Sequence, residues 1–573
     1  MRGVDGFDGY EIRIGMEEMN MSALKMKLVS SLEKVFLDQE PRAYEGTIEG
    51  FRNEIISFQA AYTLCAPETR MYVSLEIISP IAKYVHVRQV EHVPVRYAAP
   101  IDSDDNYLRK TPGLYPDLLR EIGPHTLRVR YGQWDTLWVE IDPQAELEAG
   151  EYPVTLKLTA EDESTAEVTQ SITILDAMLP PQKLVHTKWI HCDCLADYYH
   201  QEIFSEAHWQ TIERFIRKAV SGGINMMLTP IHTPPIDTRV GTERPTTQLV
   251  DVFVEKGAYR FEMSRLRRWI SMCKDCGVEY FEMAHLYTQW GAKHAPKIMA
   301  TVDGEYRKLF GWEIEATGEA YRAFLNAYIP AVRKVLEEEG IAYQTAWHIS
   351  DEPSADHIED YKAARNQVLP LLNDCFIMDA LSSFEYYQQG VVDHPVVANN
   401  HIEPFIEAKT PDLWTYYCCG QYRDVSNMFI AMPSSRNRIL AAQLFKYDVK
   451  GFLQWGYNFY YAQYSDHAVN PYLCTDGDGF VPAGDPFQVY PGMDGEPEES
   501  IRMAVTRDAM QDLRAFEMLA ELENREFVVS LMDEDLEEGI TFANYPHDGE
   551  YLISLRRKVN KAIMERMSSH TQK

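Results

Sequence analysis

"VHTKWIHCDCLADYYHQEIFSEAHWQTIERFIRKAVSGGINMMLTP" (Val185–Pro230) is the stretch that decides the fold. It opens with the run "VHTKWIHCD" and closes with "INMMLTP", and both have the length and composition of buried strands. Between them, "EAHWQTIERFIRKAVSGG" carries apolar residues at helical spacing and ends in two glycines. A strand, a helix and a second strand in this order predict two parallel strands joined by a crossover helix.

The same unit recurs toward the C-terminus, where helical patterns separate further strand patterns. The predicted strands are residues 185–193, 224–230, 278–286, 341–353, 375–381, 395–400, 412–419 and 451–459. The connections from the fifth strand to the sixth and from the sixth to the seventh are short. Strands that alternate with helices in this way predict an α/β fold, a closed (β/α)₈ barrel of the TIM type over residues 185–525.

The region before the barrel has a different rhythm. Apolar and polar residues alternate with a period of two in "TLWVEIDP", "GEYPVTLKLTA" and "TQSITILDA". These runs predict an N-terminal antiparallel β-sandwich over residues 28–178, which the proline-rich "AMLPPQKL" separates from the barrel. Residues 1–27 are interpreted as an N-terminal extension of uncertain start, and residues 526–573 as a helical tail.

We expect the sandwich to be structural and not to supply a catalytic acid. Its acidic segment "DSDDN" (Asp102–Asn106) has the composition of a solvated loop.

Composition excludes some partners. The chain has 573 residues, with 55 Lys and Arg against 87 Asp and Glu, so its formal net charge is −32. A surface this acidic repels phosphate backbones and anionic lipids, which predicts no nucleic-acid and no membrane partner. The nine cysteines are an odd number without the spacing of a disulfide framework. The first residues also lack the pattern of a secretory signal, and together these features predict a cytoplasmic protein with free thiols.

Polar and aromatic residues stand at the ends of nearly all the predicted barrel strands. They are His191, Asp193, His232, Glu282, His285, His348, Ser350, Asp351, Glu352, Asp379, Trp414, Tyr416, Gln454, Trp455 and Asn458. A single polar residue at a strand end more often stabilises a loop than takes part in chemistry. Because the loops after the strands build the active face of such barrels, so many together predict a shared polar pocket.

Asp351 and Glu352 form the most suggestive pair among these residues. They follow the strand "TAWHIS" and precede Pro353, which disfavours a helix at Glu352. Paired carboxyls at a barrel rim suit glycoside hydrolysis, and each raises the pKa of the other. The alternative is that "SDEPS" is the acidic first turn of the next helix.

The sequence predicts no metal and no other cofactor. Residues 191–194 ("HCDC") look like a ligand cluster, but strand alternation would turn the two cysteines away from His191 and Asp193. Cys273 and Cys276 form a single C-x-x-C without a second one in register. In "DGDGF", Phe480 stands where a calcium loop needs its third ligand.

Three segments carry a resemblance to a known family. They are "WHISDEP" (347–353), "GFLQWGYNFY" (451–460) and "GDPFQVYPGMDGEPEESIRMAVTRDAMQDLRAFEMLAEL" (484–522). The chain resembles glycoside hydrolase family 123 and its related uncharacterised domain family over about residues 28–522. A sandwich in front of the barrel is also the arrangement of that family.

The resemblance implies an exo-acting, retaining β-N-acetylgalactosaminidase in which the 2-acetamido group of the substrate is the nucleophile. By position, Asp351 would stabilise the acetamido group and Glu352 would be the general acid/base. The family also uses a tyrosine to hold the acetamido carbonyl, and Tyr386 or Tyr387 could serve. The implied partner is a small saccharide or a glycoconjugate glycan. The alternatives are a related glycosidase for another sugar and a carbohydrate-binding protein without catalysis.

Overall fold

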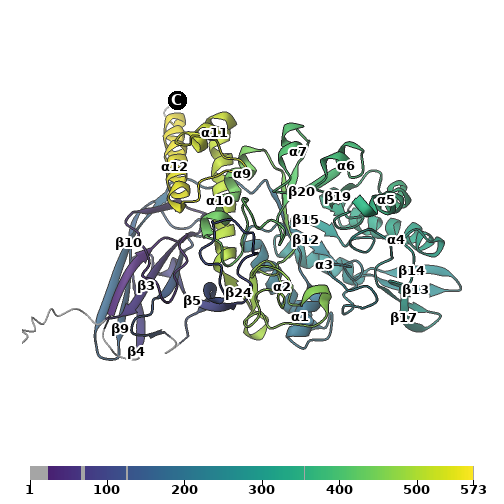
Figure 1. The fold of residues 1–573 in the computed structure, drawn as a ribbon, viewed down its shortest axis with the longest axis horizontal. Helices are drawn as coiled ribbons and strands as arrows, with labels where there is room; N and C mark the ends of the chain where they lie inside the picture. The colour runs from purple at the N-terminus through teal and green to yellow at the C-terminus, as the bar shows by residue number, and fades with distance from the viewer. Residues whose placement is uncertain (1–23, 66–70, 124–126, 354, 572–573) are drawn as a thin grey trace, which may run out of the picture.

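The computed structural model describes residues 24–65, 71–123, 127–353 and 355–571. A β-sandwich and a barrel lie side by side, and helices from the C-terminal part of the chain lie between them and above them in the view of Figure 1.

The barrel is closed and all its strands are parallel. Its strands are β11 (Val185–Lys188), β12 (Met226–Thr229), β15 (Tyr280–Met283), β18 (Thr345–Trp347), β19 (Phe376–Ala380), β20 (His394–Ala398), β21 (Trp414–Tyr416) and β22 (Gly451–Gln454). Pairing of β22 with β11 closes the barrel. Every predicted barrel strand is present, so the predicted (β/α)₈ fold is confirmed.

A helix follows each barrel strand. The helices are α1 (Cys192–Tyr198), α2 (Glu206–Ser221), α3 (Ser264–Asp275), α4 (Glu319–Glu338), α5 (Ile358–Leu372), α6 (Phe384–Gln388), α7 (Glu403–Glu407), α8 (Ser434–Arg438), α9 (Leu440–Lys446) and α10 (Ile501–Leu522). Helix α2 shows why the pattern works: Ser205 caps its first turn, while Ile212, Phe215 and Ile216 are buried on one face.

The predicted N-terminal sandwich is also present. One sheet contains β1 (Leu24–Val29), β3 (Ile56–Leu64), β8 (Asp135–Ile141), β5 (Val85–Val95) and β6 (Gly113–Glu121). The other contains β2 (Ile48–Phe51), β10 (Thr165–Leu175), β9 (Gly150–Ala160), β4 (Met71–Ile78) and β7 (Arg128–Val129). Pairing is antiparallel except between β2 and β10.

Two strands that follow the last barrel strand in the chain belong to the sandwich. The sequence interpretation had placed them inside the barrel domain. Strands β23 (Val489–Pro491) and β24 (Pro497–Ser500) extend the first sheet, and β24 pairs with β6. Arg502, at the start of α10, forms a fully buried ion pair with Asp117 of β6. The two domains therefore share one sheet.

The C-terminal helices fasten the same junction. They are α11 (Arg525–Asp533) and α12 (Gly549–Thr571). Arg556 of α12 binds Glu54 of the sandwich and Asp512 of α10 through buried ion pairs. Helix α12 thus joins the sandwich to the helical layer of the barrel.

Two hairpins that the sequence interpretation left as loops form a separate small sheet. Its strands are β14 (Ala258–Glu262), β13 (Asp251–Glu255), β16 (Ile298–Val302) and β17 (Glu305–Phe310). This sheet lies at the right-hand end of Figure 1, on the side away from the sandwich.

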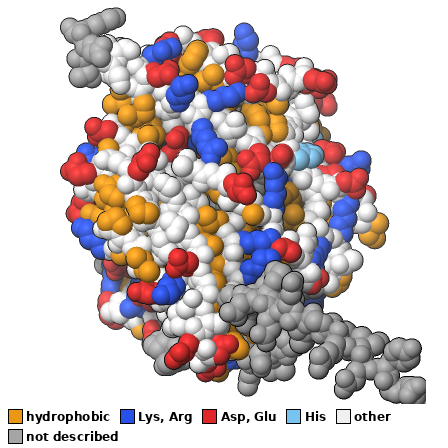
Figure 2. Space-filling view, turned by 90° about the vertical axis from the view of Figure 1, so that its left-hand side faces the viewer, with side chains coloured by type: hydrophobic (Ala, Val, Ile, Leu, Met, Phe, Trp, Pro, Cys, Tyr) orange, Lys and Arg blue, Asp and Glu red, His pale blue; other side chains and the backbone are white. Residues whose placement is uncertain are grey.

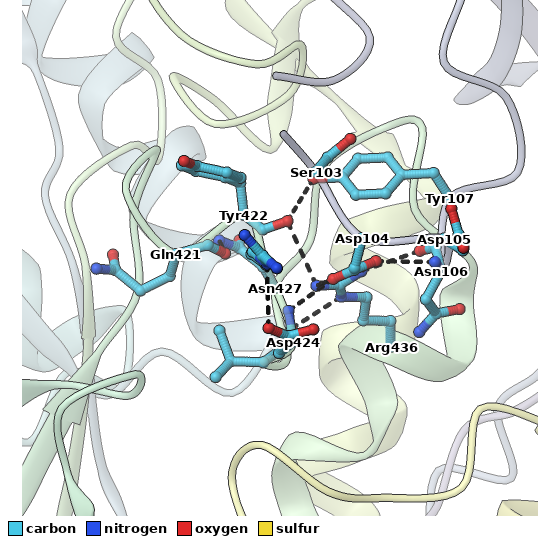
Figure 3. Close-up of polar contacts among 12 residues, drawn as sticks. Ser103, Asp104, Asp105, Asn106, Tyr107, Gln421, Tyr422, Asp424, Asn427 and Arg436 are labelled. Carbon is cyan, nitrogen blue, oxygen red and sulfur yellow. Dashed lines mark hydrogen bonds and ion pairs between the residues drawn. The ribbon is translucent and has the colours of Figure 1, made fainter. Parts of the chain in front are cut away.

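The loop after β5 contradicts the prediction of a solvated segment at Asp102–Asn106. Asp104 forms an ion pair with the fully buried guanidinium of Arg436, and the backbone N–H of Asp424 also donates to its carboxylate (Figure 3). Tyr107 donates to the carbonyl of Tyr422 over 2.7 Å. Asp105 is fully exposed. The sandwich thereby holds the loop between β21 and α8.

On the sandwich side of the molecule, acidic and basic side chains are interspersed with small apolar patches (Figure 2). Among the described residues, no helix is long and apolar enough to cross a membrane.

Candidate active site

A pocket opens where the barrel strands end, as the strand-end pattern predicts. It has a volume of about 190 Å³. Its walls are Trp189, Ile236, Asp237, Gln289, Trp290, His348, Asp351, Glu352, Ala380, Tyr416, Cys418, Cys419, Leu453, Trp455 and Phe480. Mixed aromatic and polar walls of this kind suit a sugar ring, whose faces are apolar and whose edges carry hydroxyls.

Asp351 and Glu352 face this pocket and do not cap a helix. The helical segment that follows them starts with a 3-10 turn at Ala355–His357 and continues as α5, so the pair itself is not the first turn of a helix as the alternative supposed. Glu352 has φ of 47°, in the left-handed region that side chains rarely adopt. Such a conformation costs about 1–3 kcal/mol and is typical of functional sites.

The two carboxyls have different partners. Asp351 Oδ2 accepts a hydrogen bond from Gln289 Nε2 at 2.7 Å, and Glu352 Oε1 accepts one from Tyr416 Oη at 2.8 Å. Burial, and then the neighbouring Glu352, raise the pKa of Asp351 well above its usual range, against the charge of His348. Burial also raises the pKa of Glu352, while Tyr416 and Trp290 act in the opposite direction. The pair therefore takes up protons at higher pH than free carboxyls do.

A buried chain of charges lies under the pair. His348 Nε2 donates to Glu282 Oε1 at 2.6 Å and its Nδ1 donates to Asp379 Oδ1 at 3.0 Å. Burial alone would lower the pKa of His348, but the two carboxylates raise it to about 10. His348 is therefore a cation at neutral pH. Trp189 Nε1 and Tyr361 Oη donate to the outer carboxylates and fix the chain at both ends.

His285, His348 and Asp379 come close enough together to suggest a metal site. A metal ligand must offer a lone pair, and a histidine that donates from both ring nitrogens has none left. His348 donates to a carboxylate from each nitrogen, so the residues present do not fit a metal ion here.

His191 and Asp193 lie behind the pocket wall, not on it. Asp193 binds the buried guanidinium of Arg244 through two contacts, and Arg244 Nη2 also approaches His191 Nδ1 at 3.2 Å. Arg244 Nη1 in turn donates to the carbonyl of Ile236 at 3.0 Å. The two predicted residues therefore support the segment that carries Ile236 and Asp237. Chain direction explains this: β11 ends at Lys188, before either residue.

The predicted strand-end residues that line the pocket are His348, Asp351, Glu352, Tyr416 and Trp455. Glu282 and Asp379 contact it through His348. His232 Nε2 donates to the backbone carbonyl of His285, whose ring stacks on His348 with centroids 4.2 Å apart. Asn458 forms hydrogen bonds with the backbone of His191.

The structure does not bring Trp414, Tyr386 or Tyr387 to the pocket. Trp414 points into the barrel and lies on Gly451, where a Cβ would come within 2.0 Å of its ring. Tyr386 and Tyr387 are half-buried on α6, and Tyr387 packs on Phe405. The tyrosine that reaches the pair is Tyr416, two positions after Trp414 on β21, where strand alternation puts it on the same inward side and nearer the rim.

Several wall residues were missed from the sequence. They are Trp189, Ile236, Asp237, Gln289, Trp290, Ala380, Cys418, Cys419, Leu453 and Phe480. Asp237, Trp290 and Phe480 come from long loops, where no periodic pattern marks a side chain as inward. Trp189 and Cys418 stand at strand ends, so the rule that selected the other candidates could have found them.

A closed barrel whose strand-end pocket contains two adjacent carboxyls with raised pKa values and aromatic walls defines a glycoside hydrolase. The sequence model of the glycoside hydrolase 123 catalytic domain matches residues 189–519. The chain belongs to glycoside hydrolase family 123.

The fold agrees with this family. The structure of a family 123 glycoside hydrolase from Clostridium perfringens superposes with a TM-score of 0.75 at 15% identity, over 96% of this chain and 100% of that one. A xyloglucanase from Bacteroides ovatus covers 81% of this chain and 98% of its own at 8% identity, but its TM-score of 0.30 supports no inference. Comparison with curated proteins finds no match.

Proposed function

We propose that the protein is an exo-acting, retaining β-N-acetylgalactosaminidase that uses the 2-acetamido group of its substrate as the nucleophile. The observation that carries the proposal is that Asp351 and Glu352 are consecutive and leave the barrel rim together. A protein nucleophile and a protein acid flank the scissile bond from opposite sides. Two carboxyls on one wall are better suited to a reaction in which the substrate supplies the nucleophile.

The reaction then runs in two steps. The acetamido oxygen attacks the anomeric carbon while the Glu352 carboxyl gives its proton to the glycosidic oxygen, and the bond to the leaving group breaks. Asp351 accepts a hydrogen bond from the acetamido N–H and stabilises the positive charge of the oxazolinium. Water next attacks the anomeric carbon and loses its proton to the Glu352 carboxylate, and the bond to the acetamido oxygen breaks. Two inversions give net retention.

The surroundings of Asp351 act on its charge in both directions. His348 is a cation and favours the ionised form of Asp351, which the stabilising role requires, whereas burial and the neighbouring Glu352 raise the pKa of Asp351 well above its usual range. Tyr416 is the tyrosine of the pocket wall, and its single O–H donates to Glu352; with substrate bound, the same O–H would turn to the acetamido carbonyl. The small pocket has room for a single terminal sugar, which suits exo action.

The substrate we propose is a terminal N-acetylgalactosamine on a small saccharide or glycoconjugate glycan. Hydrolysis of glycolipid glycans is described for the Clostridium perfringens relative. All nine cysteines lie in the described part of the chain as free thiols, which favours action in the reducing cytoplasm. A related sugar is the second candidate substrate.

The test is a panel of nitrophenyl glycosides that includes the β-N-acetylgalactosaminide, the β-N-acetylglucosaminide and the plain β-galactoside. We expect release of nitrophenol from the first, far less from the second and almost none from the third. If the enzyme prefers the β-N-acetylglucosaminide, the proposed sugar is wrong but the proposed substrate-assisted mechanism stands. Binding without turnover of any of the three would favour a non-catalytic carbohydrate-binding protein.

A further inference from the structure

Asp237 faces the same pocket as the catalytic pair, yet the proposed reaction assigns it no role. Its Oδ2 accepts a hydrogen bond from the backbone N–H of Tyr464 at 2.9 Å. Its Oδ1 is buried, and no described residue donates a hydrogen bond to it. Since buried polar atoms nearly always have partners, an orphan acceptor at the wall of a binding pocket calls for a donor from the ligand.

The side chain is held ready for such a donor. Asp237 has φ of 39°, a left-handed conformation shared by its pocket neighbours Trp290 and Glu352. Arg244 fixes the preceding carbonyl, at Ile236. Burial raises the pKa of Asp237 to about 6, so the carboxyl is still ionised at neutral pH and accepts hydrogen bonds strongly.

The side-chain amide of Gln289 links Asp237 to the catalytic pair and shows where Asp237 lies relative to it. The backbone N–H of Asp237 donates to Gln289 Oε1 at 2.7 Å, and Gln289 Nε2 donates to Asp351 Oδ2, also at 2.7 Å. Asp237 therefore lies beyond Gln289 on the Asp351 side of the pocket. In the proposed reaction Glu352 faces C1 of the sugar and Asp351 faces the substituent on C2. The next ring positions on that side are C3 and C4.

We propose that Asp237 is a substrate-binding residue whose Oδ1 accepts a hydrogen bond from the C3 or C4 hydroxyl of the terminal sugar. The assignment to this edge of the ring rests on the proposed function. The contact makes Asp237 a determinant of specificity, because a site built to bind a hydroxyl discriminates strongly against sugars that lack it.

The test combines Asp237→Asn with substrates that lack one hydroxyl. We would measure kcat/KM of wild type and variant on nitrophenyl N-acetylgalactosaminide and on its 3-deoxy and 4-deoxy analogues. For wild type we expect one of the two analogues to lose about 10- to 100-fold, the range of a hydrogen bond to a charged group. Asp237→Asn should lose a similar factor on the parent sugar and little more on that analogue.

Asp303→Asn is the matched control. Asp303 also has a left-handed φ, of 48°, but it stands in the turn between β16 and β17. Among the described residues, its carboxylate accepts a hydrogen bond only from the backbone N–H of Lys256. It should behave as wild type on all three substrates. Thermal unfolding of each variant separates loss of folding from loss of binding.

Equal sensitivity of wild type and Asp237→Asn to both deoxy sugars would overturn the proposal and leave Asp237 a structural partner of Tyr464. Failure of the proposed function is visible separately, because the wild type would then prefer another glycoside in the panel. In that case the deoxy series is built on the preferred sugar. Loss of the selective effect there also refutes the role of Asp237.

Discussion

The phenol of Tyr416 donates to Oε1 of Glu352 over 2.8 Å, across the barrel from the end of β21 to the end of β18. A donor to a carboxylate stabilises the ionised form and lowers the pKa. Tyr416 thus acts against burial, which raises the pKa of Glu352. The balance between the two sets the pH at which Glu352 gives up its proton.

Tyr416→Phe should shift the alkaline limb of the kcat/KM profile to higher pH. The general acid must be protonated, so activity is lost as pH rises through the pKa of Glu352, and a higher pKa moves that loss upward. Tyr417→Phe is the control, since the buried Tyr417 hydroxyl has no partner among the described residues and the residue does not line the pocket. An alkaline limb that stays in place, or moves to lower pH, contradicts the contact.

Glu352→Gln should affect substrates with poor leaving groups most. Removal of the acid leaves a basic leaving group unprotonated, whereas an activated aryl oxide leaves without help. We would measure kcat/KM across aryl N-acetylgalactosaminides of graded leaving-group pKa. Parallel dependences for wild type and variant would remove Glu352 from the acid role.

Asp351→Asn should slow good and poor leaving groups alike, by roughly 10²- to 10⁴-fold, because it removes charge stabilisation from the oxazolinium and not a proton from the leaving group. The same series of aryl substrates provides the measurement. A plain galactoside should hardly react with the wild type, since it lacks the internal nucleophile. Its efficient hydrolysis would refute the substrate-assisted mechanism.

Asp104→Ala should destabilise the protein by about 3–5 kcal/mol, because it leaves the fully buried Arg436 without its carboxylate. Asp105→Ala, next to it but fully exposed, should change the free energy of unfolding by less than about 0.5 kcal/mol. Denaturant unfolding of both variants provides the comparison. Similar values for the two would mean that the ion pair contributes little.

The same ion pair predicts a pH dependence. Burial alone would raise the pKa of Asp104, but Arg436 and the N–H of Asp424 outweigh it and lower the pKa. Because the pKa of Asp104 is lower in the folded state, its ionised carboxylate stabilises the folded protein above the ordinary pKa near 3.8. This stabilisation is lost as the pH falls through the pKa of the folded state. The stability difference between wild type and Asp104→Ala should therefore narrow below pH 3.8.

Activity should be insensitive to chelators. Both nitrogens of His348 are engaged by carboxylates, so the cluster with His285 and Asp379 offers no complete set of lone pairs to a cation. Turnover after dialysis against EDTA provides the measurement. Loss of turnover that zinc or calcium restores would contradict the expectation.

Local patterns in the sequence were sufficient to predict the barrel. Each barrel strand is a short buried run, and a helix with one apolar face follows most of them, so hydrophobic periodicity identifies the barrel. The five-residue helices α6 and α7 are too short to show such a pattern, and α6 has no buried residue. The hairpin β23–β24 was missed for a physical reason: it pairs with β6, and no local pattern shows which distant edge a strand will extend.

The pair Asp351–Glu352 could be singled out by its place after a strand end, but that position alone left a capping role equally open, and the roles proposed for the pair come from the family resemblance. The wall around the pair could not be singled out, since Asp237, Gln289 and Trp290 take their positions from loops and from each other. His191 and Asp193 show the limit of the strand-end rule. Polarity at a rim marks the region of the site but does not separate wall residues from those that hold the wall in place.

The shared sheet also has a consequence during synthesis. Arg502 and its partner Asp117 are separated by 385 positions, and β24 covers the edge of β6 only once both have been made. At about 5–20 residues per second, a ribosome needs roughly 20 to 80 s to bridge that distance. For this time the nascent sandwich has an open strand edge, which is a site for intermolecular pairing. A chaperone that covers this edge would protect the nascent sandwich until β24 has been made.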